Sequence, residues 1–352
     1  MSESTPTAYA VSPDSGEHWS APGAWTVDDG VHRIPLPLPT DGLRAVNVYV
    51  LEGPDGLTLV DGGWAITEGR AALDAGLTAL GFGFGDIRRF LVTHVHRDHY
   101  TLASVLGEEY AARVVLGVGD KPTLDLIHSD ADGRPDRSTD RLLFEAGAQE
   151  LAERWAALQH PPQDRSQWRY PDMWLDGDRP LEVAGRTLDA VHTPGHTQGH
   201  FVFADRPAGL LFAGDHVLPT ITPSIGFEPV PVLSPLGDFM ASLTKVRGLP
   251  DLRLLPAHGP IAPSSHARID QLLAHHEHRL GLCLDALAPG PRTSLQVAAE
   301  LPWTRHEHAF ATLDLFNSVL ACLETKAHLE LLAARGDVTR VETEAGVLFS
   351  RA

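Results

Sequence analysis

The sequence predicts a mixed α/β protein in which two sheets are flanked by helices. Short β-branched runs and one helical stretch follow in the order strand, strand, helix, strand between residues 45 and 93. A similar order returns between residues 187 and 256, and from residue 264 the composition turns helical. Two sheets with helices outside them are an economical way to bury both sets of strands.

The first half contains a predicted hairpin followed by a helix and a third strand. Residues 45–52 and 57–61 are predicted strands separated by Gly-Pro-Asp-Gly, which is typical of a hairpin turn. The stretch 67–80 has helical spacing and ends at Gly81, a typical C-cap residue. Residues 87–93 then form a strand that runs into a histidine-rich loop.

The second half repeats this alternation after a long insertion. The predicted elements are strands over 187–193, 200–204, 210–214 and 252–256 and a helix over 235–247. The insertion, residues 118–178, holds a predicted helix over 140–158. Long connections of this kind are often functional, so a lid over the site is one interpretation and a structural cap the other.

The C-terminal part is predicted to be a small winged-helix-like module. Helices are predicted over 264–287, 294–301 and 313–334, followed by short strands over 338–341 and 347–349. The expected organisation is an irregular leader (1–30), a main α/β domain (31–263) and this C-terminal module (264–352).

Composition narrows the function classes. The formal net charge is −18, which disfavours a polyphosphate partner such as nucleic acid. Two cysteines cannot build a disulfide framework, whereas 19 histidines are many for 352 residues. The N-terminus lacks the pattern of a signal peptide, and no run of 18 apolar residues predicts a membrane helix. We therefore expect a cytoplasmic protein with no membrane partner.

The most informative motif is Thr93-His94-Val95-His96-Arg97-Asp98-His99. In an extended loop, residues two apart project to the same side, so His94 and His96 can meet at one ion while Asp98 and His99 turn toward a second. Imidazole and carboxylate groups suit borderline divalent metals. The spacing therefore predicts a metal site.

Three further segments place ligand-type side chains after predicted strands. They contain His196 with His200, Asp215 with His216, and His258. Open sheets commonly collect their ligands at the ends of strands.

With these motifs, the sequence resembles the metallo-β-lactamase superfamily, whose pattern is His-x-His-x-Asp-His followed by a His, a bridging Asp and a last His. The resemblance covers residues 31–263 and implies an αββα sandwich. It implies that one metal is held by His94, His96 and His196 and the other by Asp98, His99 and His258, with Asp215 bridging them. Asp61, in the Asp-Gly-Gly turn, would orient a ligand histidine or serve only as a turn residue.

The two metals imply the chemistry. Two divalent ions can share a hydroxide that is a nucleophile at neutral pH, and they can stabilise the oxyanion formed when a carbonyl is attacked. Zinc is the expected metal, with iron or manganese as alternatives. Asp98 is also expected to carry a proton to the leaving group.

Other residues near the motifs are candidate substrate contacts. His200 and His216 flank ligands, and Tyr100 stands where many members of the family have glycine. Phe227 belongs to the apolar, proline-rich segment 217–239, which can form a hydrophobic wall for an acyl group. The remaining histidines, including those of the helix 264–287 and His328, are predicted to lie mostly on the surface.

The expected function is hydrolysis of a carboxylic ester, thioester or lactone, with a small molecule as substrate. One alternative is a lactamase-like endoribonuclease or phosphodiesterase, because winged helices often bind nucleic acid. Another alternative is β-lactam hydrolysis as a side activity. Residues 290–352 carry six Arg or Lys against eight Asp or Glu, whereas a module that grips phosphates should be basic. The C-terminal module is therefore interpreted as a packing element or a homo-oligomer interface.

Overall fold

The computed structural model describes residues 9–10, 18–39, 42–129, 137–158, 164–304 and 307–352. It divides into two compact units. The sheet unit comprises Met1–Ile127, Asp164–Pro223 and Ser242–Ile269, and the helical unit comprises His128–Gln163, Ser224–Ala241 and Asp270–Ala352. Residues 1–8 and 11–17 of the predicted leader and residues 130–136 of the insertion lie outside the described residues.

The first sheet of the sheet unit has eight strands in chain order. They are β1 (Tyr9–Ala10), β2 (Trp25–Asp28), β3 (Val31–Pro37), β4 (Ala45–Gly53), β5 (Gly56–Val60), β6 (Ile87–Leu91), β7 (Arg113–Gly117) and β8 (Met173–Leu175). The predicted hairpin joins β4 to β5, with Gly53 opposite Gly56. From β5 to β8 the pairing is parallel, so the carboxyl ends of β5, β6 and β7 share one edge.

The second sheet has five strands in the order β13-β12-β11-β10-β9. They are β9 (Arg179–Val183), β10 (Arg186–His192), β11 (Phe201–Asp205), β12 (Leu210–Gly214) and β13 (Arg253–Pro256). Each of β10 and β12 is antiparallel to β11, and β13 is parallel to β12. The strands β10, β12 and β13 therefore also end at one edge.

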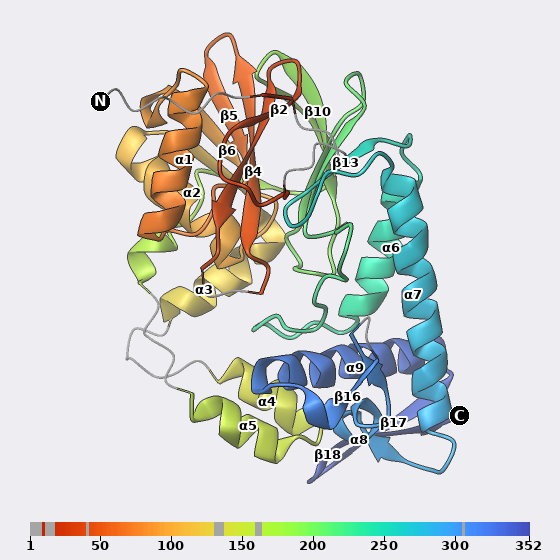
Figure 1. Ribbon diagram of the computed structural model, residues 1–352. Helices are drawn as coiled ribbons and strands as arrows, with labels where there is room; N and C mark the ends of the chain where they lie inside the picture. The colour runs from red at the N-terminus through yellow and green to blue at the C-terminus, as the bar shows by residue number, and fades with distance from the viewer. Residues whose placement is uncertain (1–8, 11–17, 40–41, 130–136, 159–163, 305–306) are drawn as a thin grey trace. The chain divides into compact units, whose positions relative to one another are not determined.

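Two apolar cores hold the layers of the sheet unit together. One lies between the first sheet and the helices α1 (Thr67–Ala79) and α2 (Arg97–Tyr110), which lie along its outer face (Figure 1). The other lies between the two sheets and includes Tyr49 and Phe212, whose rings meet edge to face. The end of α6 (Pro235–Arg247) reaches the second sheet, where Lys245 donates to the carbonyl of His192. This is the predicted αββα layering.

The sequence analysis predicts no helix directly after residues 87–93, whereas helix α2 begins inside the histidine-rich motif. The histidine-rich segment was expected to be a loop, but the helix starts at Arg97, so Asp98 and His99 lie in its first turn. Gly81 does end α1 with a left-handed backbone, φ +86°, as predicted. The short helices of the sheet unit are η1 (Phe84–Asp86), η2 (Val118–Asp120) and η3 (Arg165–Gln167), and α3 (Lys121–Ser129) follows η2.

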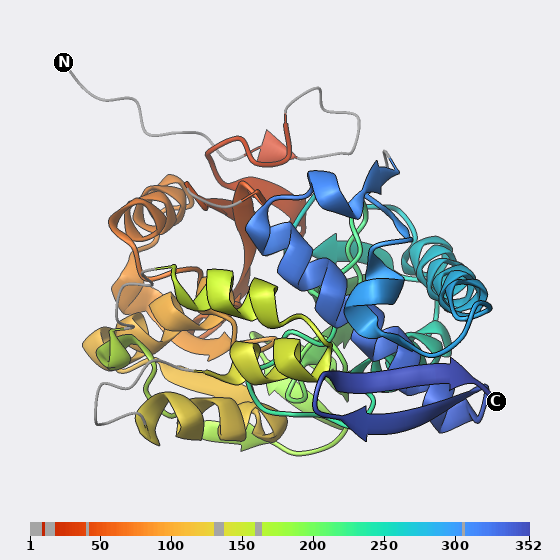
Figure 2. The same cartoon turned by 90° about the horizontal axis from the view of Figure 1, so that it is seen from below.

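In the helical unit, α4 (Ser138–Glu145), α5 (Gln149–Ala156) and α9 (Leu315–Arg335) lie close together (Figure 2). Their buried side chains contribute to an apolar core of this unit. The prediction of one helix over 140–158 was wrong. Gly147 has φ +72° and breaks the stretch into α4 and α5. The lid interpretation of this insertion and the domain boundary at residue 263 stay predictions.

The C-terminal residues follow the order expected of a winged helix. The helix α7 (Ser265–Ala286) is followed by β14 (Arg292–Thr293), α8 (Ser294–Ala298), α9, β17 (Val338–Thr343) and β18 (Gly346–Arg351). The strands form a sheet in the order β14-β18-β17. The remaining elements are β15 (Pro302–Trp303), β16 (His308–Ala309) and η4 (Phe310–Thr312). No helix among the described residues is long and apolar enough to cross a membrane.

Candidate metal centre

The loop after β6 and the turn after β5 form one side of the candidate centre. Asp61 directly follows β5 and has φ +62°, a backbone conformation that is unusual for a residue with a side chain. Its Oδ1 accepts hydrogen bonds from the backbone N–H of Thr93 at 2.7 Å and from the Thr93 hydroxyl at 2.9 Å. The strained turn thereby holds the start of the segment that carries His94 and His96.

The second sheet supplies the other side. His196 lies in the loop after β10, Asp215 directly follows β12, and His258 lies two residues after β13. Because these strands end at one edge, the three side chains meet, and all three are buried.

Three histidines form the first donor cluster. The Nδ1 atom of His96 lies 2.9 Å from Nε2 of His94 and 3.0 Å from Nε2 of His196. His94 and His196 are buried, whereas His96 is partly exposed. These three nitrogens are close enough to share one metal ion.

The second cluster contains Asp98, His99, His258 and Asp215. Oδ2 of Asp98 lies 3.7 Å from Nε2 of His99 and 3.4 Å from Nε2 of His258. Oδ1 of Asp215 lies 3.6 Å from Nε2 of His99 and 3.4 Å from Nε2 of His258. The other oxygen of Asp215, Oδ2, lies 3.5 Å from Nε2 of His196 in the first cluster.

These separations suit a cation better than they suit hydrogen bonds. Nε2 of His99, Nε2 of His258 and Oδ1 of Asp215 are buried and make no hydrogen bond within the described part of the chain. A tetrahedral ion with bonds of about 2.0–2.1 Å separates its donor atoms by about 3.3–3.4 Å. Buried polar atoms without partners are costly, and an ion between them would remove that cost. The donor set therefore fits metal ions.

Hydrogen bonds behind the clusters set the orientation of the rings. Nδ1 of His99 donates to Oδ2 of Asp61 at 3.0 Å, and Nδ1 of His258 donates to the carbonyl oxygen of Ala45 at 2.8 Å. Nδ1 of His94 lies 3.0 Å from the Thr93 hydroxyl. Because the Nδ1 proton is used behind each ring, its Nε2 faces the cluster, as metal ligation requires. Asp61 therefore serves both as a turn residue and as the partner of His99.

The charges of the cluster match its donor roles. Burial lowers the pKa of His96 to about 3 and that of His94 well below its usual value, so both rings stay neutral. Burial raises the pKa of Asp98, but His99 and His258 outweigh it and hold that pKa below its ordinary value. Burial lowers the pKa of His99, but Asp61, Asp98 and Asp215 together raise it to about 10. In the absence of a metal, a proton on His99 thus offsets the carboxylates, and a cation would take over that task.

Asp120 is a further part of the centre that the sequence analysis missed. It lies just after β7 in η2 and is fully buried. One carboxylate oxygen accepts from the N–H of Val95 and the other from the N–H of Gly199, each at 2.8 Å. Asp120 therefore joins the loop of His94 and His96 to the loop of His196. Its place after a parallel strand of the same edge was the signal that could have found it.

The four predicted substrate contacts lie in different surroundings. His200 is fully buried, with Nδ1 2.8 Å from the Thr193 hydroxyl, and its Nε2 accepts from the N–H of Asp215 at 3.2 Å. His216 is also fully buried. The His200 ring thus lies behind the ligand Asp215, and the centroid of the His216 ring lies 5.9 Å from that of His200.

Tyr100 and Phe227 are placed in apolar packing. Tyr100 is fully buried, its ring stacks on Trp168, and its hydroxyl donates to the carbonyl of Arg169. Because it is fully buried, Tyr100 offers no surface to a substrate in this structure. In the helical unit, Phe227 meets Trp155 and Phe316 edge to face.

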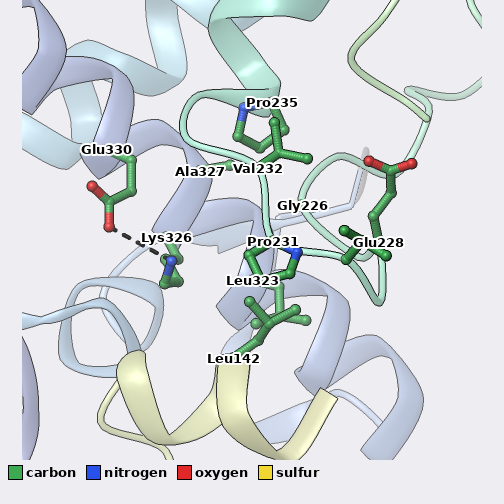
Figure 3. A pocket seen from close by; sticks show the side chains of 11 residues that line it. Leu142, Gly226, Glu228, Pro231, Val232, Pro235, Leu323, Lys326, Ala327 and Glu330 are labelled. Carbon is green, nitrogen blue, oxygen red and sulfur yellow. Dashed lines mark ion pairs between the residues drawn. The ribbon is translucent and has the colours of Figure 1, made fainter. Parts of the chain in front are cut away.

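The helical unit has a pocket of its own, with an empty volume of about 400 Å³. Its walls are mostly apolar and proline side chains, and its cation, Lys326, is paired with Glu330 at 3.5 Å and with Glu145 at 3.2 Å (Figure 3). The pocket thus offers a cavity without a set of reactive groups, and we assign no chemistry to it.

Comparison with known proteins agrees with this geometry. The family model of the metallo-beta-lactamase superfamily matches residues 41–258, which contain every residue of the two donor clusters. The chain belongs to this superfamily. The αββα fold and the His and Asp clusters that can hold metal ions are those of a superfamily hydrolase.

Relatives extend the likeness to the whole chain. It is 26% identical over 318 residues to the probable metallo-hydrolase YqjP of Bacillus subtilis, covering 87% of this chain and 92% of that protein. The crystal structure of a metallo-beta-lactamase family protein from Thermus thermophilus superposes with a TM-score of 0.74 at 30% identity, covering 93% of this chain and 100% of that one. A shorter match, 35% identical over 117 residues, is to the atrochrysone carboxyl ACP thioesterase AgnL7 of Paecilomyces divaricatus and covers 32% of this chain and 35% of that protein.

Proposed function

We propose that this protein is a hydrolase with two metal ions that cleaves a carboxylic ester, thioester or lactone. The observation that carries the proposal is the arrangement around Asp215. One of its oxygens faces His196 of the first cluster and the other faces His99 and His258 of the second. A carboxylate with one oxygen toward each of two donor sets is suited to bridge two cations.

The residues divide into two sets in this proposal. His94, His96 and His196 hold one ion, Asp98, His99 and His258 hold the other, and Asp215 touches both. When bound, two divalent ions such as zinc supply an activated water molecule and the positive charge that stabilises the oxyanion formed at a carbonyl. Iron or manganese would serve the same donors.

The protein's own residues orient the ligand histidines and transfer a proton to the leaving group. Asp61 and the carbonyl of Ala45 fix the rings of His99 and His258, and Asp120 holds the two histidine loops at their separation. Asp98 is partly exposed, with 14% of its side chain accessible, and as a carboxylate it can take up a proton released at the centre and then pass it to the leaving group.

Two observations support an acyl substrate over a phosphodiester. The acidic chain, with a formal charge of −18, repels polyphosphate. A protein that is similar to this chain over about a third of the length of each is named as a thioesterase.

The proposal is tested with a substrate panel on metal-quantified protein. Thioesters, lactones, simple esters, β-lactams and single-stranded RNA are compared at equal protein concentration for the wild type and for His96→Ala. We expect hydrolysis of at least one acyl substrate and its loss in the variant. Cleavage of RNA alone, or acyl hydrolysis that His96→Ala leaves unchanged, would contradict the proposal.

A further inference from the structure

Part of the histidine excess lies in the helical unit, where the sequence predicted surface residues. That prediction was wrong for two of them. His276 on α7 is fully buried, and His328 on α9 is 1% exposed. The two helices face each other at this point, because Nδ1 of His276 lies 3.2 Å from Nε2 of His328 (Figure 1).

The hydrogen bonds determine where the protons of this pair lie. Nδ1 of His328 is 2.7 Å from the carbonyl oxygen of Glu324 and must donate, because a carbonyl only accepts. Burial keeps both rings neutral by lowering the pKa of His328 to about 3 and that of His276 well below its usual value. Nε2 of His328 is then a lone pair, so Nδ1 of His276 carries the proton that bonds to it.

This chain of hydrogen bonds leaves Nε2 of His276 as a bare lone pair. That atom is buried and has no hydrogen-bond partner among the residues that the structure describes. A buried acceptor without a partner costs about 1–3 kcal/mol, so a ligand at this position would be stabilised.

Two other donor groups lie beside His276. One ligand atom each from His275, His276 and the Glu324 carboxylate lie within 4.8 Å of one another. The Glu324 carboxyl group comes from α9, one turn before His328, whereas both histidines come from α7. His275 is less buried than its neighbour and reaches solvent, which gives an ion a route of entry.

We propose that His275, His276 and Glu324 form a second metal site, in the helical unit, for a borderline divalent cation such as zinc. Two imidazole nitrogens and one carboxylate oxygen are a donor set that zinc uses, with water completing the coordination. The ion ties α7 to α9 within the helical unit. Its role is structural, because its ligands come from two different helices that the ion would hold together.

The ion also resolves the charge problem of Glu324. Burial raises the pKa of this carboxyl group, and Arg279 lowers it only in part. A cation held between this carboxylate and the two histidine nitrogens would stabilise the negative charge of the carboxylate. His328 acts as a positioning residue, since its hydrogen bond sets the tautomer of His276.

The test uses the full-length protein with the first centre disabled by His96→Ala and Asp98→Ala, so that ions at the two sites are not confused. Zinc binding is measured by equilibrium dialysis and elemental analysis, and cobalt is used as a visible-absorption probe of coordination. In this background we expect the protein to bind one zinc ion. Glu324→Gln and His275→Ala are each expected to lower the affinity for this ion by roughly tenfold or more. His278→Ala, an exposed histidine on the same helix, is the matched control and is expected to bind as before.

His275→Ala guards against a trivial loss of fold, since its side chain reaches solvent. Zinc is expected to raise the Tm of the disabled background and of the His278→Ala control, but not that of His275→Ala. If the background binds no zinc, or if Glu324→Gln and His275→Ala bind it as tightly as the control, the proposal is overturned. Neither result depends on hydrolytic activity, so the hydrolase proposal is tested separately.

Discussion

Asp61 shows how one residue can serve both the backbone and the candidate centre. Its φ of +62° is a conformation that costs a non-glycine residue about 1–3 kcal/mol, and its carboxylate binds both Thr93 and His99. A glycine would relieve the strain but would remove both contacts. The carboxylate is therefore what an aspartate supplies at this strained position and a glycine would not.

The first prediction concerns the partner of His99. Asp61→Asn replaces a carboxylate, which only accepts hydrogen bonds, by an amide, whose NH₂ group can face Nδ1 of His99. Such a donor disfavours the tautomer of His99 in which Nδ1 carries the proton and Nε2 is free to bind a metal. We expect the metal affinity of the centre to fall by about 10–100-fold while the fold is kept. Zinc competition with a chromophoric chelator measures the change, and Asp74→Asn, an exposed residue on α1, is the control. Unchanged affinity in Asp61→Asn would refute this role.

The second prediction concerns the pH dependence that Asp120 brings. Burial raises its pKa to about 7 against the hydrogen bonds from Gly199, Thr197 and Val95. Between about pH 4 and pH 7 the folded state therefore holds a proton that the unfolded chain has released, so this group makes the free energy of unfolding fall as pH rises. Asp120→Asn is expected to remove this slope in metal-free protein. Denaturant titrations across that range measure it, and an identical slope in the variant would contradict the prediction.

Residue patterns predicted much of the candidate centre but not all of it. The six-residue stretch from His94 to His99 is local, so its spacing was visible in the sequence. Asp120 acts through contacts with residues 25 and 79 positions away, and no local pattern marks such contacts. The burial of His276 depends on a partner on another helix, 52 residues along the chain, so a polar helix was the natural but incorrect interpretation.

At the scale of elements, the break between α4 and α5 shows how one backbone angle decides packing. Gly147 has φ +72°, and a Cβ atom there would lie 2.6 Å from Cβ of Thr293. The break lets both short helices contribute leucines to the core that they share with α9. Helical spacing alone predicts one long helix, because the spacing of apolar residues does not show that Gly147 packs closely against Thr293.

The third prediction tests that constraint. Gly147→Ala adds backbone strain and a steric clash, and we expect the free energy of unfolding to fall by about 3 kcal/mol. Gly177→Ala is the matched control, since Gly177 has φ +69° but nothing within 4 Å of the added Cβ. The control is expected to lose only about 1 kcal/mol. Equal losses in the two variants, measured by denaturant unfolding, would show that the contact with Thr293 does not matter.

At the scale of the whole molecule, the chain contains two units with separate cores, and the division is not sequential. The helical unit draws on residues 128–163, 224–241 and 270–352. The boundary at residue 263, which composition predicts, stays a prediction, because composition changes along the chain whereas these units join segments that are distant in the sequence. The order of the layers was predictable, since it follows from the alternation of strands and helices.

The fourth prediction uses both cysteines as probes of the helical unit. Cys283 and Cys322 are buried there, and burial raises the pKa of each thiol to about 12. We therefore expect neither thiol to react with a disulfide reagent at pH 8 in the native protein, and both to react in denaturant. Rapid reaction of the native protein would mean that the core of this unit is open to solvent.

The central claim is that hydrolysis requires two cations held by the clusters around Asp215. Its most direct test is reconstitution of metal-stripped Glu324→Gln protein, in which the proposed second site is weakened, with counted equivalents of zinc. Hydrolysis of an acyl substrate from the panel is predicted to appear with added zinc and to level off at two equivalents, and to stay absent when Asp98→Ala is added to the variant. Full activity of the stripped protein, with elemental analysis confirming that no metal is left, would contradict the claim.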